Sequence, residues 1–223
     1  MLYWLLKATA PLWSVPREER KDSFTMRKET YERVSETFAI ESRAILEQEK
    51  ALDMEAFSRA VDALCKCGTV ITCASGHSGI AAKKFAHAMS CIERPGVFLS
   101  PAEAVHGGLG VVQKDDVVVF VSRGGKTAEL LPVIDVANEK GATIITLTEN
   151  LESPLAKAAD IVLPLKIEKE TDKYNCMATT SFTVTVALFD ALWMAVMEET
   201  DYKKEQFALI HPGGAVGARL NHR

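Results

Sequence analysis

Two Ser/Gly-rich segments decide the fold: Ala74-Ser75-Gly76-His77-Ser78-Gly79 and Ser122-Arg123-Gly124-Gly125-Lys126-Thr127. The first follows the apolar run 69–73 and the second follows the apolar run 117–121. Each precedes a stretch with helical periodicity, so the pattern predicts a strand, a tight turn and a helix, twice. One such turn usually only reverses the chain. Two of them, with Ser/Thr hydroxyls and backbone N–H groups at helix starts, indicate a site for a phosphorylated ligand.

Strands rich in Val and Ile alternate with helices along the chain. The predicted strands are 69–74, 96–99, 117–121, 143–148 and 161–165, and the predicted helices are 27–50, 53–67, 78–92, 102–108, 127–140, 153–158, 178–199 and 203–209. Strands that are apolar on both faces and separated by helices predict a parallel sheet covered on two sides. Ligands of such α/β folds bind beyond the carboxyl ends of the strands, where both Ser/Gly-rich segments fall.

The length of 223 residues predicts one domain, residues 27–223, with room for little else. The preceding residues 1–26 begin with an apolar run, Met1 to Leu6, which is too short for a membrane span and is broken by Lys7 and Pro11. We interpret residues 1–26 as a disordered tail, or as the product of a start codon assigned too early, and we expect no membrane association.

Charge and cysteine content narrow the possible functions. A net charge of -4 without a basic run argues against nucleic acid as the main partner. The five cysteines are odd in number and lie mostly in apolar stretches, which is typical of reduced thiols in the cytoplasm. Because Cys65-Lys66-Cys67 lacks the spacing and partner ligands of a zinc site, we interpret these cysteines as packing residues at a helix end.

Four motifs carry a resemblance to a known family: Ser75 to Gly79, Pro101-Ala102-Glu103-Ala104-Val105-His106-Gly107-Gly108-Leu109-Gly110, Ser122 to Glu129, and His211-Pro212-Gly213-Gly214-Ala215-Val216-Gly217. Over roughly residues 35–220 the chain resembles the SIS (sugar isomerase) domains of the arabinose-5-phosphate isomerase family. The resemblance implies a flavodoxin-like five-stranded parallel α/β domain that interconverts an aldose phosphate and a ketose phosphate without metal or organic cofactor. It also implies a homo-oligomer, usually a tetramer, with active sites shared between subunits. Many relatives carry two regulatory CBS modules after this domain, and we expect these modules to be absent here.

The resemblance also assigns site residues. It implies four catalytic positions, Glu170, Glu129, His211 and His106, and a substrate- and phosphate-binding set, Ser75, Gly76, His77, Ser78, Ser122, Arg123, Gly124, Lys126 and Thr127. From the sequence alone, Glu170 reads as part of a surface charge run and Glu129 as a carboxylate that stabilises a helix N-terminus. With the resemblance, both become active-site groups. Glu170 is placed ahead of Glu129 as the base, because it follows a different strand from the phosphate-binding turn.

The two histidines have different expected roles. His211 precedes a Pro-Gly-Gly turn, and an ordinary histidine pKa near 6.5 suits proton shuttling at neutral pH. It is therefore predicted to be the acid/base partner of the glutamate. The resemblance implies that His106 points into the active site of the neighbouring subunit and assists opening of the sugar ring.

Four positions depart from the family pattern. His77 replaces the lysine of the first turn, Arg123 and Lys126 bring positive charge to the second, and Gly108 replaces the usual aspartate. The reaction class is thus better defined than the substrate. The favoured function is isomerisation of D-arabinose 5-phosphate and D-ribulose 5-phosphate. The alternatives are isomerisation of another sugar phosphate, such as 3-hexulose 6-phosphate, and a non-catalytic sensor that binds a sugar phosphate.

Overall fold

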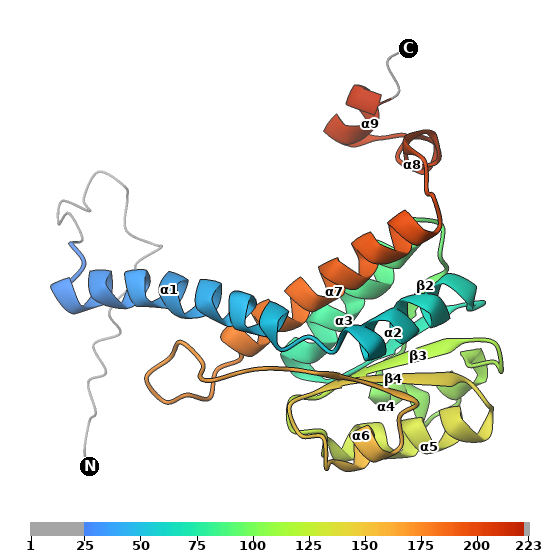
Figure 1. The fold of residues 1–223 in the computed structure, drawn as a ribbon, viewed down its shortest axis with the longest axis horizontal. Helices are drawn as coiled ribbons and strands as arrows, with labels where there is room; N and C mark the ends of the chain where they lie inside the picture. Colours follow the sequence, from blue (N-terminus) through green and yellow to red (C-terminus); the bar gives the residue numbers. More distant parts are fainter. Residues whose placement is uncertain (1–24, 221–223) are drawn as a thin grey trace, which may run out of the picture. The chain divides into compact units, whose positions relative to one another are not determined.

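The sheet forms from the Val- and Ile-rich runs of the sequence. In the computed structural model, which describes residues 25–220, five parallel strands pair in the order β2-β1-β3-β4-β5 (Figure 1). Their bounds are β1 Val70–Cys73, β2 Gly96–Phe98, β3 Val117–Val121, β4 Thr143–Thr148 and β5 Ile161–Pro164. This strand order is that of the flavodoxin-like doubly wound folds, so the predicted fold class is confirmed.

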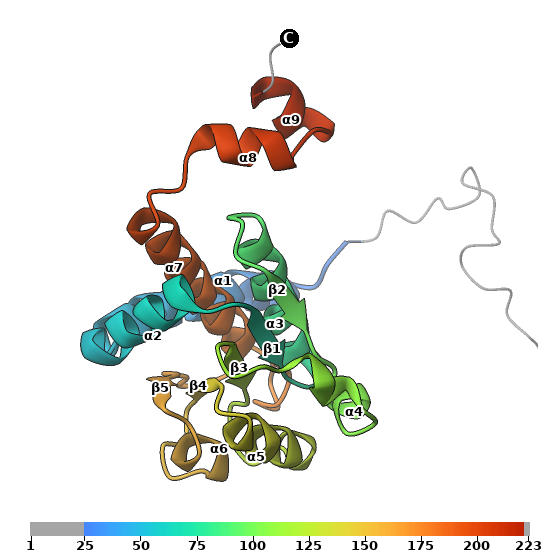
Figure 2. The ribbon, with the colours of Figure 1, turned by 90° about the vertical axis from the view of Figure 1, so that its right-hand side faces the viewer.

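The central strand β3 shows how both faces of the sheet are covered. Its residues are all buried, and successive side chains point to opposite faces. Val117, Val119 and Val121 join one core cluster, whereas Val118 and Phe120 join a second cluster on the opposite face. Figure 2 shows the two helical layers on either side of the sheet. A strand buried on both faces explains why its sequence is apolar throughout rather than alternating.

The connections between strands place helices on both faces of this sheet. On the first face lie α2 (Met54–Lys66), α3 (Gly76–Ser90) and α7 (Thr180–Glu199), and on the second lie α5 (Leu131–Glu139) and α6 (Pro154–Lys157). Among residues 25–220, α7 is the one helix long and apolar enough to cross a membrane by length and composition. It packs against α2 and α3, where the rings of Phe85 and Phe189 stack with centroids 4.3 Å apart. These contacts make α7 a core helix of the domain.

The first helix, α1 (Lys28–Lys50), crosses the boundary between two units of the chain, which falls between Glu36 and Thr37. In the second unit, Gln48 docks the end of α1 onto the end of β5: its Nε2 donates to the Pro164 carbonyl at 2.9 Å, and its Oε1 accepts from the Lys166 N–H at 2.8 Å. Most of the predicted N-terminal extension, residues 1–24, lies outside the described residues. The predicted domain start at residue 27 stays a prediction.

Two predicted helices are wrong in detail. The predicted helix 102–108 is α4 (Pro101–Ala104), followed by a 3₁₀ turn, η3 (Gly108–Val111), because Gly107 adopts a left-handed φ of 104° that ends the helix. The predicted helix 127–140 begins instead as a 3₁₀ turn, η4 (Ala128–Leu130), and continues as α5.

The C-terminal segment also differs from expectation. The helix predicted over 203–209 is α8 (Lys204–Ile210), but the Pro-Gly-Gly motif that predicts a turn also leads into a further helix, α9 (Gly214–Leu220). A short helix after two glycines has little local signal, since glycine disfavours helix formation.

Candidate active site

The two Ser/Gly-rich turns meet at one edge of the sheet. They follow β1 and β3, which are hydrogen-bonded neighbours with Cys73 opposite Phe120. Because the strands are parallel, both turns leave from the same, carboxyl-terminal edge. The sequence prediction that both segments fall at the carboxyl ends of parallel strands is therefore confirmed.

The first turn forms the N-terminus of α3. Ser75 is the N-cap residue, and no side chain caps the helix; Gly76 follows with a φ of 59°. The first N–H groups of a helix have no intrahelical partners and carry partial positive charge. An uncapped start of a 15-residue helix offers these donors to an anion.

The second turn is closed by its own hydroxyl groups. Ser122 is buried, and its Oγ lies 2.8 Å from Thr127 Oγ1 while accepting a hydrogen bond from the Gly125 N–H at 3.1 Å. Gly125 has a φ of 65°, and a Cβ there would lie 2.0 Å from Ser153 Oγ, so only glycine fits. Gly124 and Lys126 are exposed at the tip of this turn. Two hydroxyls predicted to bind phosphate thus also hold the turn in shape.

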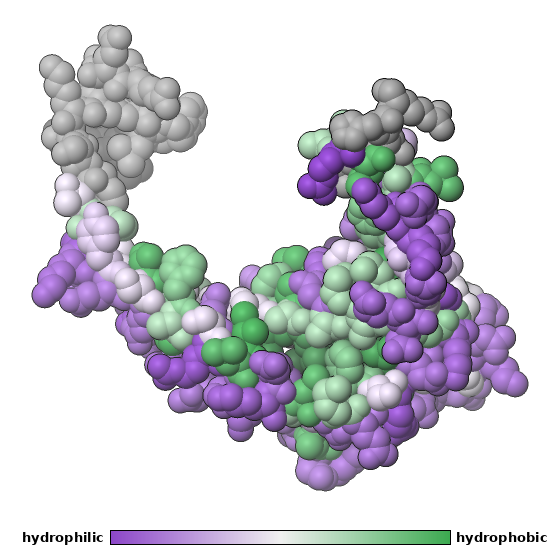
Figure 3. Space-filling view, turned by 45° about the horizontal axis from the view of Figure 1, so that its top comes forward, coloured by the Kyte–Doolittle hydropathy of each residue, from purple (hydrophilic) through white to green (hydrophobic). Residues whose placement is uncertain are grey.

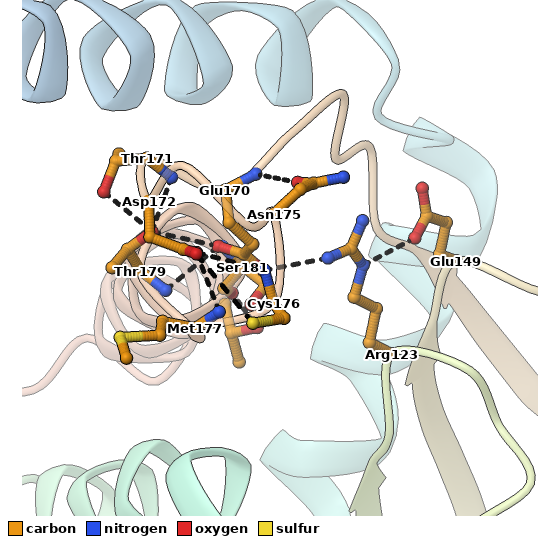
Figure 4. A network of polar contacts seen from close by, with 11 residues as sticks. Arg123, Glu149, Glu170, Thr171, Asp172, Asn175, Cys176, Met177, Thr179 and Ser181 are labelled. Atoms are coloured by element: carbon orange, nitrogen blue, oxygen red, sulfur yellow. Dashed lines mark hydrogen bonds and ion pairs between the residues drawn. The ribbon is translucent and has the colours of Figure 1, made fainter.

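Arg123 joins three strand ends into one charged network (Figure 4). Its Nε donates to Glu149 Oε2 at 2.8 Å, and its Nη1 donates to Glu170 Oε1 at 2.9 Å. Arg123 follows β3, Glu149 follows β4 and Glu170 comes after β5. Two carboxylates therefore compensate the one guanidinium charge.

Glu170 lies at the centre of this network with 3% of its surface exposed. Its Oε2 accepts hydrogen bonds from the Thr179 N–H at 2.9 Å, the Thr179 hydroxyl at 3.1 Å and the Ser181 N–H at 3.1 Å. Burial raises the pKa of the Glu170 carboxyl, but the hydrogen bonds from Ser181 and Thr179 outweigh burial and hold the pKa below its ordinary value. Glu170 is thus an ionised carboxylate that anchors the N-terminus of α7.

The loop between Glu170 and α7 is organised by Asp172. Its carboxylate accepts hydrogen bonds from the backbone N–H groups of Tyr174 at 2.8 Å, Cys176 at 3.0 Å and Met177 at 2.8 Å. These backbone hydrogen bonds, with that from Met177 the strongest, lower the pKa of Asp172 below its ordinary value. The Glu170 N–H donates to Asn175 Oδ1 at 2.7 Å, which ties the start of the loop to its middle (Figure 4). No motif in the sequence marks Asp172 for this role.

A pocket of about 320 Å³ opens beside the first turn. It contains Ser75, Gly76 and, from the 3₁₀ turn η4, Glu129, so three of the predicted site residues share one cavity. Lys83 of α3 and Ser100, which precedes α4, also line it, and sequence reasoning missed both. The signal for Lys83 is its spacing: positions 76, 79, 80 and 83 share one helical face.

A second, smaller cavity of about 20 Å³ lies between the starts of α3 and α7. His77, Ser78 and Arg123 line it, and the His77 ring meets the Phe182 ring edge-on with centroids 6.2 Å apart. Its volume is about that of one water molecule. Of the predicted binding residues, Ser75 and Gly76 line the larger cavity and His77, Ser78 and Arg123 line the smaller one. The other four line neither cavity: Ser122, Gly124, Lys126 and Thr127.

His106 and His211 line neither of these two cavities. His106 is exposed after α4. His211 ends α8, where its Nδ1 lies 2.9 Å from the Phe207 carbonyl oxygen and its ring stacks on the Phe207 ring at 3.8 Å. Helix α8 is tied to the amino-terminal edge of the sheet, because Gln206 Nε2 donates to Glu93 Oε2 at 2.7 Å just before β2. Within one chain, His211 is not brought to the two turns.

Among residues 25–220 no group of three or more His, Cys, Asp or Glu side chains has the geometry to hold a metal ion. The described cysteines are free thiols, and burial raises the pKa of Cys67 to about 11 and that of Cys73 to about 12. These two thiols are protonated at neutral pH and behave as apolar core groups.

Comparison with known proteins agrees with this geometry. Arabinose 5-phosphate isomerase KdsD of Pseudomonas aeruginosa is 42% identical over 153 residues, which are 69% of this chain and 47% of that protein. Arabinose 5-phosphate isomerase KpsF of Escherichia coli is 37% identical over 188 residues, which are 84% of this chain and 58% of that protein. This chain thus spans about half the length of the curated relatives it matches.

Solved structures match the whole fold. A Listeria monocytogenes protein, 43% identical, superposes with a TM-score of 0.81 over 85% of this chain and 100% of its own. An Escherichia coli CFT073 protein, solved in complex with arabinose 5-phosphate, is 30% identical and superposes with a TM-score of 0.79 over 84% of this chain and 100% of its own. Residues 63–195 match the SIS domain family. The chain therefore belongs to the SIS domain family.

Proposed function

We propose that this chain is a phosphosugar aldose–ketose isomerase that interconverts D-arabinose 5-phosphate and D-ribulose 5-phosphate. The observation that carries the proposal is the combination, at one sheet edge, of an uncapped helix start and Glu129 around a 320 Å³ pocket. The names of the relatives support the substrate: two are arabinose 5-phosphate isomerases, and a structure fully covered by this chain is a complex with arabinose 5-phosphate.

The reaction needs a base, an acid and a fixed phosphate. In the aldose-to-ketose direction a base removes the proton from C2, the electron pair forms the C1–C2 double bond, and the C1 oxygen accepts a proton. The resulting enediol then loses the proton of its C2 hydroxyl and receives a proton at C1, which yields the ketose. A positioned carboxylate is suited to carry the proton between the two carbons, and a bound phosphate orients them.

We propose Glu129 as this base, ahead of Glu170. Glu129 is exposed to the larger pocket, whereas the carboxylate of Glu170 is buried and already accepts hydrogen bonds from Thr179, Ser181 and Arg123. Each carboxylate oxygen has two lone pairs: those of Glu170 Oε2 face three donors, and Oε1 accepts from Arg123, so at most one lone pair is left for a carbon-bound proton. Although burial raises the pKa of Glu170, the hydrogen bonds from Ser181 and Thr179 lower it below its ordinary value and so make Glu170 a weaker base. Glu170 is assigned the positioning of Arg123 and of the start of α7.

The two histidines support a shared active site. Because His106 and His211 line neither cavity of their own chain, we assign them to the pockets of neighbouring subunits. Figure 3 shows that the face carrying α3 and α7 is largely apolar, and exposed apolar side chains on these helices include Ile80 and Met194. Faces of this kind favour contacts between subunits. We propose a homotetramer in which His106 serves ring opening and His211 serves the substrate oxygens of a neighbouring subunit.

The proposal places the enzyme in the cytoplasm, where free thiols such as those of this chain persist. Phosphorylated sugars are charged at neutral pH, so a soluble intracellular substrate pool fits the same compartment.

A panel of sugar phosphates tests the function. Purified protein is assayed in D₂O for isomerisation of D-arabinose 5-phosphate, D-ribulose 5-phosphate and 3-hexulose 6-phosphate. The pentose phosphate products are examined for deuterium at C1 of the ketose and at C2 of the aldose. Conversion of the pentose phosphates with deuterium incorporation supports the proposal. Faster conversion of the hexulose phosphate would reassign the substrate, and absence of conversion and of exchange with every sugar would favour a binding protein.

The base is tested in the same assay with Glu129→Gln and Glu170→Gln. The first variant is expected to lose exchange and turnover while keeping substrate affinity. If Glu129→Gln still exchanges the C2 proton and Glu170→Gln, folded and able to bind, does not, Glu170 is the base.

A further inference from the structure

Among residues 25–220, Lys83 is the one basic residue that lines the 320 Å³ pocket, and Glu129 is the one acidic residue. The Lys83 Nζ lies 4.8 Å from the centre of the Phe98 ring, on the pocket wall formed by the end of β2. A cation held over an aromatic ring keeps its charge and gives up part of its conformational freedom in advance. In the described part of the chain neither Lys83 nor Glu129 forms an ion pair, so both side chains are available to a ligand in the cavity.

The position of Lys83 on α3 directs it toward the uncapped helix start. Lys83 lies two turns after Gly76 on the same face of the helix, and helical side chains lean toward the N-terminus. The next residue, Lys84, has a different role, because its ammonium pairs with Asp190 and lies 5.2 Å from the centre of the Trp193 ring, both on α7. Two adjacent lysines therefore serve different faces of α3, one the pocket and one the core.

The other cations near the site are less available to an anion in this pocket. Arg123 donates to Glu149 and Glu170 and lines the smaller cavity, which has room for about one water molecule. Lys126 lies at the exposed tip of the second turn and does not line the pocket. Of the two cavities at this edge of the sheet, the one with the volume for a sugar phosphate thus has its positive charge on Lys83.

We propose that Lys83 binds the phosphate group of the substrate, together with the N–H groups at the start of α3, and makes the pocket selective for phosphorylated sugars. This inference rests on the proposed isomerase function for its substrate, but the phosphate contact itself is independent of the reaction. Because Lys83 acts on binding, its loss raises the substrate KM and leaves kcat nearly unchanged.

The test compares Lys83→Met and Lys83→Arg with a matched control, Lys114→Met. Lys114 is an exposed lysine in the loop before β3, at the opposite edge of the sheet, so its loss removes the same charge from a distant site. The KM for D-arabinose 5-phosphate and the inhibition constant of inorganic phosphate are measured, and melting curves verify the fold. Lys83→Met is expected to raise both constants about tenfold or more, which is the worth of one charge-assisted hydrogen bond. Lys83→Arg and Lys114→Met are expected to stay within about twofold of the wild type.

Two results would overturn the assignment. The first is a KM and a phosphate inhibition constant for Lys83→Met equal to those of Lys114→Met. The second is a fall in kcat with an unchanged KM, which would make Lys83 an electrophile for the sugar oxygens. Direct calorimetric titration with inorganic phosphate separates this inference from the proposed function. If the wild-type protein isomerises no sugar phosphate but binds phosphate, and Lys83→Met weakens that binding, the isomerase proposal fails and the phosphate contact stands. Equal phosphate affinity of the wild type and Lys83→Met would refute the proposed phosphate contact, whether or not the protein is an active isomerase.

Discussion

Replacing Glu170 with glutamine tests whether this carboxylate holds the fold of the site. The substitution keeps the shape of the side chain but removes the negative charge and turns one acceptor oxygen into a donor NH₂ group. Either Arg123 or the backbone N–H groups of Thr179 and Ser181 must then face that NH₂ group. At a residue with 3% of its surface exposed, water cannot replace the lost partner.

The size of the effect follows from the number of hydrogen bonds and from exposure. Each hydrogen bond to a charged group is worth about 1.5–3 kcal/mol, and breaking one partner of a buried ion pair costs about 3–5 kcal/mol. The Arg123 side chain is 35% exposed, and solvent screening reduces its share of the loss. We expect Glu170→Gln to lower the free energy of unfolding by about 3 kcal/mol. For a domain of this size that corresponds to a fall in Tm of about 6–12 °C.

A matched control is available at the other carboxylate of the network. Glu149 contacts the same guanidinium group at 2.8 Å, but its side chain is 39% exposed. An exposed ion pair is worth about 0–1 kcal/mol, so Glu149→Gln is expected to shift the melting temperature by no more than a few degrees. Both variants are melted at one protein concentration, because assembly stabilises a folded subunit.

The lowered pKa of Glu170 also predicts in which direction the stability difference between wild type and Glu170→Gln changes with pH. Since the pKa of Glu170 is lowered in the folded protein, its stabilising effect is complete above the ordinary value of 4.5 and is lost as the pH falls through the lower, folded value. The difference in stability between wild type and Glu170→Gln should therefore be full at neutral pH and shrink in acid. Equal melting of Glu170→Gln and Glu149→Gln, or a difference that does not shrink in acid, would refute the anchoring role.

Three further predictions concern catalysis, assembly and the second turn. Glu129→Gln is expected to lower kcat by about 10²–10⁴ with an unchanged melting temperature, because this side chain is exposed and acts on the substrate; steady-state kinetics and a melting curve decide. Mixed subunits of His106→Ala and Glu129→Gln are expected to regain activity that neither has alone, whereas full wild-type activity in a monomer verified by sedimentation would exclude shared sites. Gly125→Ala is expected to destabilise the fold by more than about 2 kcal/mol, since its Cβ would lie 2.0 Å from Ser153 Oγ at a left-handed φ, and urea unfolding measures the loss.

The strands were predictable because burial on both faces of the sheet strongly constrains their sequences. A parallel strand covered on both faces must be apolar throughout, and runs such as 117–121 satisfy this condition without reference to the rest of the chain. The predicted bounds agree with β1 to β5 to within one residue. The two turns were placed correctly for the same reason, because each directly follows such a strand.

Helix ends and short helices were less predictable. The end of α4 depends on the left-handed conformation of Gly107, and α9 forms after glycines that disfavour a helix locally. In both places the local propensities are weak, so the surrounding fold decides which conformation is adopted.

The sequence by itself determined the elements, their order and the edge of the sheet where the chemistry gathers, since hydrophobic periodicity and turn residues are local properties. Only the tertiary structure determined which charged residue has a structural role and which one faces the pocket. Glu170 and Glu129 look alike in sequence, but Glu170 is buried against Arg123 and the start of α7, while Glu129 faces the pocket with Lys83. The role of a carboxylate depends on the number of donors around it and on its access to solvent. Both quantities are set by segments far apart in the chain, and they arise only when the fold brings those segments together.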